Sequence, residues 1–311
     1  MNAATGALLI DGASPASFRA VGLVVVALLC GGFAATHLRS RFPAWVVGAV
    51  ALLATLRFVD HEPAGTRMVA IVVTLLLAMK AIVASGADTT LTLRQWIAFT
   101  LWPGMRPSIF AVLGRRPREG ARGLARDGAS SLGAGAILLV IARAMASVLS
   151  PFAARIFATP LLLVGLSLML HFGLLNLMAA GWRTRGVAAE RLFRDPLHAK
   201  SLTDFWSRRW NLAFTEMTAV AIHRPIRMLA GRKVATAVSF LASGLLHELA
   251  ISVPARGGYG LPTLYFAFHG LLVLRDTRSR AVMYFALIGP ILLVFHLPFL
   301  RSIVWPLVGI R

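Results

Sequence analysis

Residues Val238–Pro254 read VSFLASGLLHELAISVP, an apolar run with a histidine and a glutamate near its centre. With the residues just before it, this run reaches about 20 mostly apolar residues, the length of a helix that crosses a bilayer. Similar runs recur along the chain and predict about eight transmembrane helices, near 20–37, 43–58, 68–86, 128–150, 156–181, 234–253, 260–274 and 281–300. The expected fold is therefore an all-α polytopic membrane protein.

The composition agrees with this expectation. Of the 311 residues 58% are hydrophobic and 14% are charged, and the mean hydropathy is +0.75. Soluble domains have about 45–50% apolar and about 25% charged residues. A soluble enzyme, a disordered chain and a secreted disulfide scaffold are excluded, and the single Cys30 excludes an internal disulfide or a cysteine-based metal site.

Two stretches are intermediate in character. Residues 95–112 are apolar but contain Pro103, Gly104 and Pro107, so we expect an interfacial or re-entrant segment. Residues 201–230 mix aromatic and arginine residues, as amphipathic helices at a membrane surface do. No repeat and no appended soluble region is evident, so residues 1–311 are expected to form a single membrane-embedded domain.

Basic residues give the chain a formal net charge of +20, from 32 Lys and Arg against 12 Asp and Glu. Most of them fall between the apolar runs, in 38–42, 87–127, 182–233 and 275–280. Because cytoplasmic loops carry such an excess, both termini are expected outside, and the partner of these charges is the bilayer rather than nucleic acid. The predominance of Arg over Lys suggests a bacterial chain, and hence the inner membrane.

His247 is the most informative residue of the opening run. It lies roughly 20 Å from the inside end of its helix, where an ionisable group is costly and by default functional. Ser243 and Gly244, one turn back, would leave a slot beside the imidazole. Burial disfavours the charged imidazole, so His247 is a candidate general base. Glu248 faces about 100° away and is expected to pair with another helix, for instance through an arginine.

Two other interpretations of this helix remain open. His247 would serve as an interhelical hydrogen-bond donor if Ser243 and Gly244 only allow close helix packing. Alternatively, Ser243 and His247 would form the nucleophile and base of a hydrolase, although small-residue packing explains this spacing better.

A second segment combines aromatic, cationic and amide side chains. Residues Asp204–Asn211 read DFWSRRWN, within a basic loop expected on the cytoplasmic side. A helix lying in the interface would have this composition. The excess of arginine would also attract a polyanionic carrier such as coenzyme A.

Taken together and in this order, the two segments resemble the membrane-bound O-acyltransferase superfamily. Residues 204–211 match the FWGRRWN signature of its wax synthase branch, with Ser207 in place of the usual glycine, and 240–248 match its SGxxHE helix. The likeness covers about 165–275. Ser252-Val253-Pro254 is also similar to the diacylglycerol and sterol acyltransferases, whereas His269 departs from the polar residue usual there.

The resemblance implies an acyl-CoA-dependent O-acyltransferase whose acceptor is a long-chain alcohol, giving a wax ester. His247 would be the catalytic base and Asn211 would position or polarise the reacting groups. The acyl-CoA entrance would be lined by Phe205, Trp206, Arg208, Arg209 and Trp210. Supporting or substrate-slot residues would be Ser243, Gly244, Glu248, His269 and Asp204. Acyl-CoA would be a co-substrate, with no permanently bound cofactor and no metal.

Other functions are kept as alternatives. The acceptor would be a diacylglycerol, a sterol, a glycan or a specialised metabolite in other members of the superfamily. A non-enzymatic transporter is suggested by the intramembrane Lys80 and Arg143, but the inverted repeats of transporters are not evident. His171 and His296 are expected to be packing residues.

Overall fold

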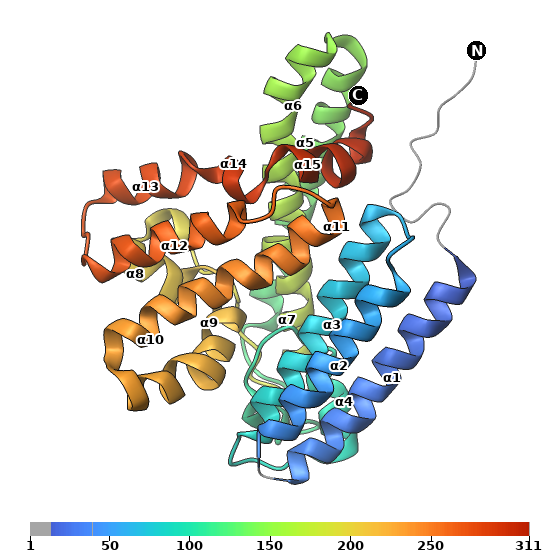
Figure 1. Cartoon of the computed structure of the whole chain (residues 1–311), viewed down its shortest axis with the longest axis vertical. Helices are drawn as coiled ribbons and strands as arrows, with labels where there is room; N and C mark the ends of the chain where they lie inside the picture. The colour runs from blue at the N-terminus through green and yellow to red at the C-terminus, as the bar shows by residue number, and fades with distance from the viewer. Residues whose placement is uncertain (1–13, 39, 311) are drawn as a thin grey trace.

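The computed structural model describes residues 14–38 and 40–310, and its described elements are all helical, with no strand among them. The predicted all-α class is therefore confirmed. The prediction that the N-terminus lies on the outer side of the membrane concerns residues 1–13, which are not among the described residues. Figure 1 shows long helices in three groups, which follow one another along the chain.

Within the described residues, five helices are long and apolar enough to cross a membrane. They are Pro15–His37, Ala64–Ser85, Ala121–Val148, Pro151–Thr184 and Leu212–Ala255. A bent pair, Arg280–Val294 and Leu297–Val308, makes up to six if counted as one span, and its axes differ by 62°. The predicted number of about eight was too high by this criterion. Two expected spans are the shorter apolar helices Phe42–Phe58 and Leu261–Leu274, and the 17-residue Phe42–Phe58 rises only about 25 Å at about 1.5 Å per residue.

The N-terminal group consists of α1 (Pro15–His37), α2 (Phe42–Phe58) and α3 (Ala64–Ser85), which lie side by side (Figure 1). α1 begins where the Ser14 hydroxyl accepts a hydrogen bond from Ala16 N, with proline at the first helical position. α2 and α3 approach closely at Gly48, where a Cβ would lie 2.9 Å from the Cβ of Ala78.

The segment predicted not to cross is the short helix α4 (Leu93–Thr100) followed by the 3-10 turn η1 (Pro107–Phe110). Thr92 and Gln95 form a capping box at the start of α4. The aromatic residues of this segment are almost fully buried, namely Trp96, Phe99, Trp102 and Phe110. Irregular backbone is therefore packed within the protein here, as membrane proteins require.

The second group is a hairpin of long helices. It comprises α5 (Ala121–Val148), α6 (Pro151–Ser167), the π-helical turn η2 (Leu168–Leu174) and α7 (Leu175–Thr184). Small residues let α5 and α6 touch, because a Cβ at Gly135 would lie 2.6 Å from the carbonyl oxygen of Gly165.

The third group contains most of the predicted site. In chain order it consists of η3 (Pro196–His198), α8 (Leu202–Asp204), the π-turn η4 (Phe205–Arg209), α9 (Leu212–Thr218), η5 (Ala219–His223), α10 (Arg224–His247), η6 (Glu248–Ser252), α11 (Val253–Ala255) and α12 (Leu261–Leu274). Gly231, at φ 80° and ψ 173°, interrupts α10 and changes the direction of the chain there. The chain ends with α13 (Arg280–Ile288), α14 (Ile291–Val294), α15 (Leu297–Phe299), η7 (Leu300–Val304) and η8 (Trp305–Val308).

Candidate active site

A cavity of about 740 Å³ lies among η4, α9, α10 and α12. Its lining includes five of the predicted site residues, Trp206, Trp210, Asn211, Ser243 and His247. The two halves of the sequence motif are therefore brought together around one space. The other predicted residues, Asp204, Phe205, Arg208, Arg209, Gly244, Glu248 and His269, do not line it.

The His247 imidazole is held by its own helix. Its Nδ1 lies 2.7 Å from the Ser243 carbonyl oxygen, which can only accept a hydrogen bond, so Nδ1 is the protonated nitrogen. A neutral imidazole then carries its lone pair on Nε2. The ring packs against Phe266, with centroids 4.3 Å apart. This arrangement leaves a basic nitrogen on a side chain that lines the cavity.

Gly244 and Glu248 hold α12 against α10. A Cβ at Gly244 would lie 2.7 Å from Thr263 Cα, so only glycine permits this crossing. Glu248 Oε1 accepts hydrogen bonds from Thr263 N at 3.0 Å and from Thr263 Oγ1 at 2.9 Å. Glu248 thus pairs with another helix as predicted, although through a threonine rather than an arginine. Both residues support the His247 wall from outside the cavity.

Asn211 occupies a backbone conformation that few residues tolerate. Its φ of 45° is left-handed, and Asn is one of the side chains that adopt this region readily. Asn211 is the N-cap residue of α9, and its Oδ1 accepts a hydrogen bond from Phe214 N at 3.2 Å. Since Oδ1 serves as the helix cap, the Nδ2 amide is the group that Asn211 can offer to a ligand.

The aromatic residues of η4 form a stacked wall. Phe205 stacks on Trp210 with centroids 5.4 Å apart, and Trp210 meets Phe193 edge-on at 4.9 Å. Trp206 contacts the rings of Phe266 and His269 at 5.5 Å each. Packing of this kind gives the 205–210 turn a defined shape beside the cavity.

The arginines of the turn lie away from the cavity. Arg209 Nε donates to Asp204 Oδ2 at 2.8 Å, and Arg209 Nη1 donates to the Asp195 carbonyl oxygen at 3.0 Å. Partial burial raises the pKa of Asp204, but the hydrogen bond from Lys200 N and the Arg209 guanidinium outweigh it, and the pKa is lowered. Arg209 and Asp204 therefore brace the turn, and Arg208 is exposed.

Three further histidines lie outside the cavity lining. His269 is fully buried, and its Nδ1 bonds the Tyr265 carbonyl oxygen at 2.8 Å. His171 bonds Ser167 Oγ at 3.0 Å and stacks on Phe193 at 4.4 Å. His296 Nε2 lies 3.2 Å from Ser252 Oγ. Among the described residues, no group of three His, Cys, Asp or Glu could hold a metal ion.

The cavity lining also includes basic residues that were not predicted as site residues. They are Arg232, Lys233 and Arg278, and we call these three residues the basic rim. Arg278 forms an ion pair with Asp276 at 2.8 Å. Arg232 and Lys233 directly follow the break at Gly231 in α10, and Arg278 follows the end of α12. The sequence Gly-Arg-Lys at 231–233 could have indicated these residues, but it does not differ from the other basic stretches between apolar runs.

Residues 189–268 match the family described as "Membrane bound O-acyl transferase family", and both Asn211 and His247 lie inside the match. This region belongs to that family. The chain is accordingly a multi-pass integral membrane protein, and the resemblance expected from its motifs is confirmed.

The relatives of this membrane-bound O-acyltransferase region include plant enzymes. It is 32% identical over 106 residues to a probable long-chain-alcohol O-fatty-acyltransferase 3 of Arabidopsis thaliana, covering 31% of each chain. It is 34% identical over 98 residues to a long-chain-alcohol O-fatty-acyltransferase of Simmondsia chinensis, covering 28% of each chain. The matched stretch thus spans about a third of the length of the curated relatives.

Proposed function

We propose that this protein transfers a fatty acyl group from acyl-CoA to the hydroxyl of a long-chain alcohol and so makes a wax ester. The acceptor class comes from the names of the relatives that the region resembles. The observation that carries the chemistry is the His247–Ser243 hydrogen bond, which leaves Nε2 unprotonated on a residue of the cavity lining.

In the proposed reaction His247 acts as a general base. As the alcohol oxygen attacks the thioester carbonyl carbon, the hydroxyl proton moves to His247 Nε2. The tetrahedral intermediate collapses, the carbon–sulfur bond breaks, and the thiolate of coenzyme A takes the proton from the imidazolium. The Ser243 carbonyl retains Nδ1–H throughout and holds the ring in place.

Asn211 would stabilise the charge that develops in this reaction. Its Nδ2 amide can donate a hydrogen bond to the carbonyl oxygen as that oxygen becomes an oxyanion. Aromatic residues of the cavity lining, Trp206, Phe214, Phe240 and Phe266, offer an apolar environment for acyl chains. Such surroundings keep out the water that would hydrolyse the thioester.

The basic rim would bind the phosphates of coenzyme A. Arg232 and Lys233 lie in α10, within the segment 182–233 that the charge distribution predicts to be cytoplasmic, where acyl-CoA is available. The same topology puts both termini outside, in a bacterial inner membrane. Arg208 and Arg209, the cations predicted from the sequence to lie at the acyl-CoA entrance, do not line the cavity, whereas the rim residues do.

Reversing two charges of the rim should weaken binding of acyl-CoA. We expect Arg232→Glu/Lys233→Glu to raise the KM for palmitoyl-CoA by about 10-fold or more, since each lost charge-assisted hydrogen bond contributes about 1.5–3 kcal/mol. The KM for palmitoyl-pantetheine, which has no phosphate, should stay unchanged. Steady-state kinetics with both donors makes the comparison.

The matched control is Arg224→Glu/Arg227→Glu, which reverses two charges of α10 before the break at Gly231 that do not line the cavity. This variant should keep the KM of the unaltered protein. Equal increases of KM in both variants would indicate a general field effect and would contradict a phosphate site at the rim.

A Ser–His hydrolase is the second candidate, because Ser243 also lines the cavity. The imidazole, however, bonds the Ser243 carbonyl and not its hydroxyl. We expect Ser243→Ala to keep acyl transfer within about threefold, because the carbonyl that orients His247 remains. Loss of all activity in this variant, measured by product formation from labelled acyl-CoA, would favour the hydrolase.

The experiment that tests the function uses purified protein with radiolabelled palmitoyl-CoA and three acceptors, hexadecanol, a diacylglycerol and a sterol, assayed separately. We expect labelled ester with hexadecanol. Ester with another acceptor alone would keep the reaction class but change the substrate. Folded protein that makes no ester with any of them and releases only fatty acid would overturn the proposal.

A further inference from the structure

Lys80 is a charged residue for which the proposed reaction has no use. It lies in α3, is 0% exposed, and is among the largest fully buried side chains of the described residues. Its Nζ donates a hydrogen bond to the Gly104 carbonyl oxygen and lies 3.7 Å from the centroid of the Phe99 ring. An ionisable residue buried in a transmembrane helix is costly, so it is by default a candidate for a functional role.

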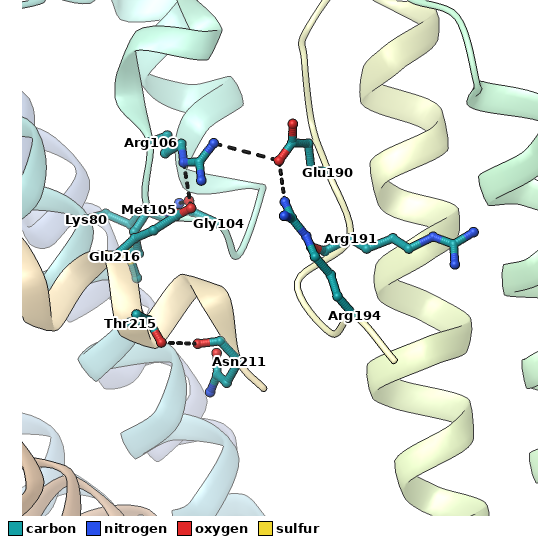
Figure 2. A network of polar contacts seen from close by, with 10 residues as sticks. All are labelled: Lys80, Gly104, Met105, Arg106, Glu190, Arg191, Arg194, Asn211, Thr215 and Glu216. Atoms are coloured by element: carbon teal, nitrogen blue, oxygen red, sulfur yellow. Dashed lines mark hydrogen bonds and ion pairs between the residues drawn. The ribbon is translucent and has the colours of Figure 1, made fainter. Parts of the chain in front are cut away.

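The loop that Lys80 contacts also contacts α9. Next to Gly104, the Met105 N–H donates to Glu216 Oε2 at 3.3 Å, and Arg106 Nε lies 2.5 Å from Glu216 Oε1. Figure 2 shows Lys80, this loop and Glu216 together, with Arg106 continuing to Glu190 and Arg194. The 104–106 loop thus bridges Lys80 of α3 and Glu216 of α9.

α9 presents two faces to two different surroundings. Phe214, Thr215 and Thr218 line the cavity, and Asn211 precedes them at the start of the helix. Leu212 and Glu216 line a separate small pocket beside Arg106. Thr215 also donates to the Trp206 carbonyl oxygen at 2.9 Å, which ties α9 to the aromatic turn. The position of α9 therefore sets the position of Asn211.

We propose that Lys80 and Glu216 are positioning residues, which act through the 104–106 loop to fix α9 and thereby Asn211 on the cavity wall. Neither of them lines the cavity. The inference rests on the proposed acyltransferase function for its kinetic readout. Their variants should therefore slow the chemical step and leave binding of acyl-CoA unchanged, because misplacement by about 1 Å can cost 100-fold in rate.

The test compares Lys80→Met, Glu216→Gln and the double variant with the unaltered protein. We expect each single change to lower kcat by about 10-fold or more with the KM for palmitoyl-CoA within about twofold. If the two residues act through one link, the double variant should lose less than the product of the two single losses. Glu216→Gln keeps an acceptor for the Met105 N–H. It therefore provides the kinetic test on its own if Lys80→Met does not fold.

Hydrogen–deuterium exchange provides a readout that needs no activity. Amides of 212–218 should exchange faster in the Lys80 and Glu216 variants, while those of α5 and α6 remain unchanged. The matched control Glu190→Gln alters a carboxylate at the outer edge of the same network and should leave both kcat and α9 exchange unaltered.

Three results would overturn the inference: kcat values close to that of the unaltered protein, a change confined to KM, or unchanged exchange in α9. An unaltered protein that makes no ester would contradict the proposed function instead. In that case faster exchange confined to α9 would still support the link from Lys80 to Glu216, and unchanged exchange would refute it.

Discussion

Replacing His247 by glutamine should abolish acyl transfer while leaving the fold intact. The Gln side chain can still donate to the Ser243 carbonyl oxygen, as Nδ1 of His247 does, so the local packing is kept. The variant cannot accept the alcohol proton. Since general-base catalysis contributes about 10²–10⁴-fold, we expect kcat to fall by about 1,000-fold with little change in KM. Single-turnover assays with labelled palmitoyl-CoA and hexadecanol measure the loss.

His269 provides the matched control for this change. It too bonds the carbonyl oxygen four residues before it, at 2.8 Å, and it too is a histidine on an apolar helix. It does not line the cavity. His269→Gln should therefore keep kcat within a few-fold of the unaltered protein. Comparable losses in both variants would show that any histidine-to-glutamine change disturbs this bundle, and would remove the argument for His247 as the base.

The sequence predicted the helical class and most helix positions because hydrophobic run length is a direct physical signal. It overestimated the spans where apolar runs were real but short. Phe42–Phe58 and Leu261–Leu274 are apolar helices, yet their lengths fall short of a full crossing by the usual measure. The composition of an apolar run does not give the first and last residues of its helix, because capping residues and breaks in the helix determine them.

The candidate site was predictable only in part. His247 could be proposed because an ionisable residue in an apolar helix is unusual, and Asn211 because its motif resembles that of a known family. The roles of neighbouring charges could not be found, because they depend on distant partners. Arg209 is held by Asp204, so it is not part of the cavity. Lys80 meets a carbonyl 24 residues away, and only the fold puts the 104–106 loop beside it.

Replacing Asn211 by aspartate should also lower kcat strongly. Aspartate tolerates the left-handed backbone and can cap α9 by accepting from Phe214 N, as Oδ1 of Asn211 does. It lacks the Nδ2 amide, however, and adds a negative charge where an oxyanion would form. Removing one oxyanion donor costs about 100- to 1,000-fold in kcat, and we expect a loss of at least this size. Thermal unfolding in detergent should be nearly unchanged.

Asn211→Ala separates the cap from the donor. Alanine removes both, so it should lose activity to a similar degree and also about 2–3 kcal/mol of stability, since an N-cap contributes about 1 kcal/mol and the left-handed backbone costs alanine about 1–2 kcal/mol. If Asn211 served only as a cap, Asn211→Asp would retain nearly full activity and Asn211→Ala would not. That result would contradict the assignment of the amide to the oxyanion. Because the same amide depends on the placement of α9, it would also remove the reason for Lys80 and Glu216 to influence kcat.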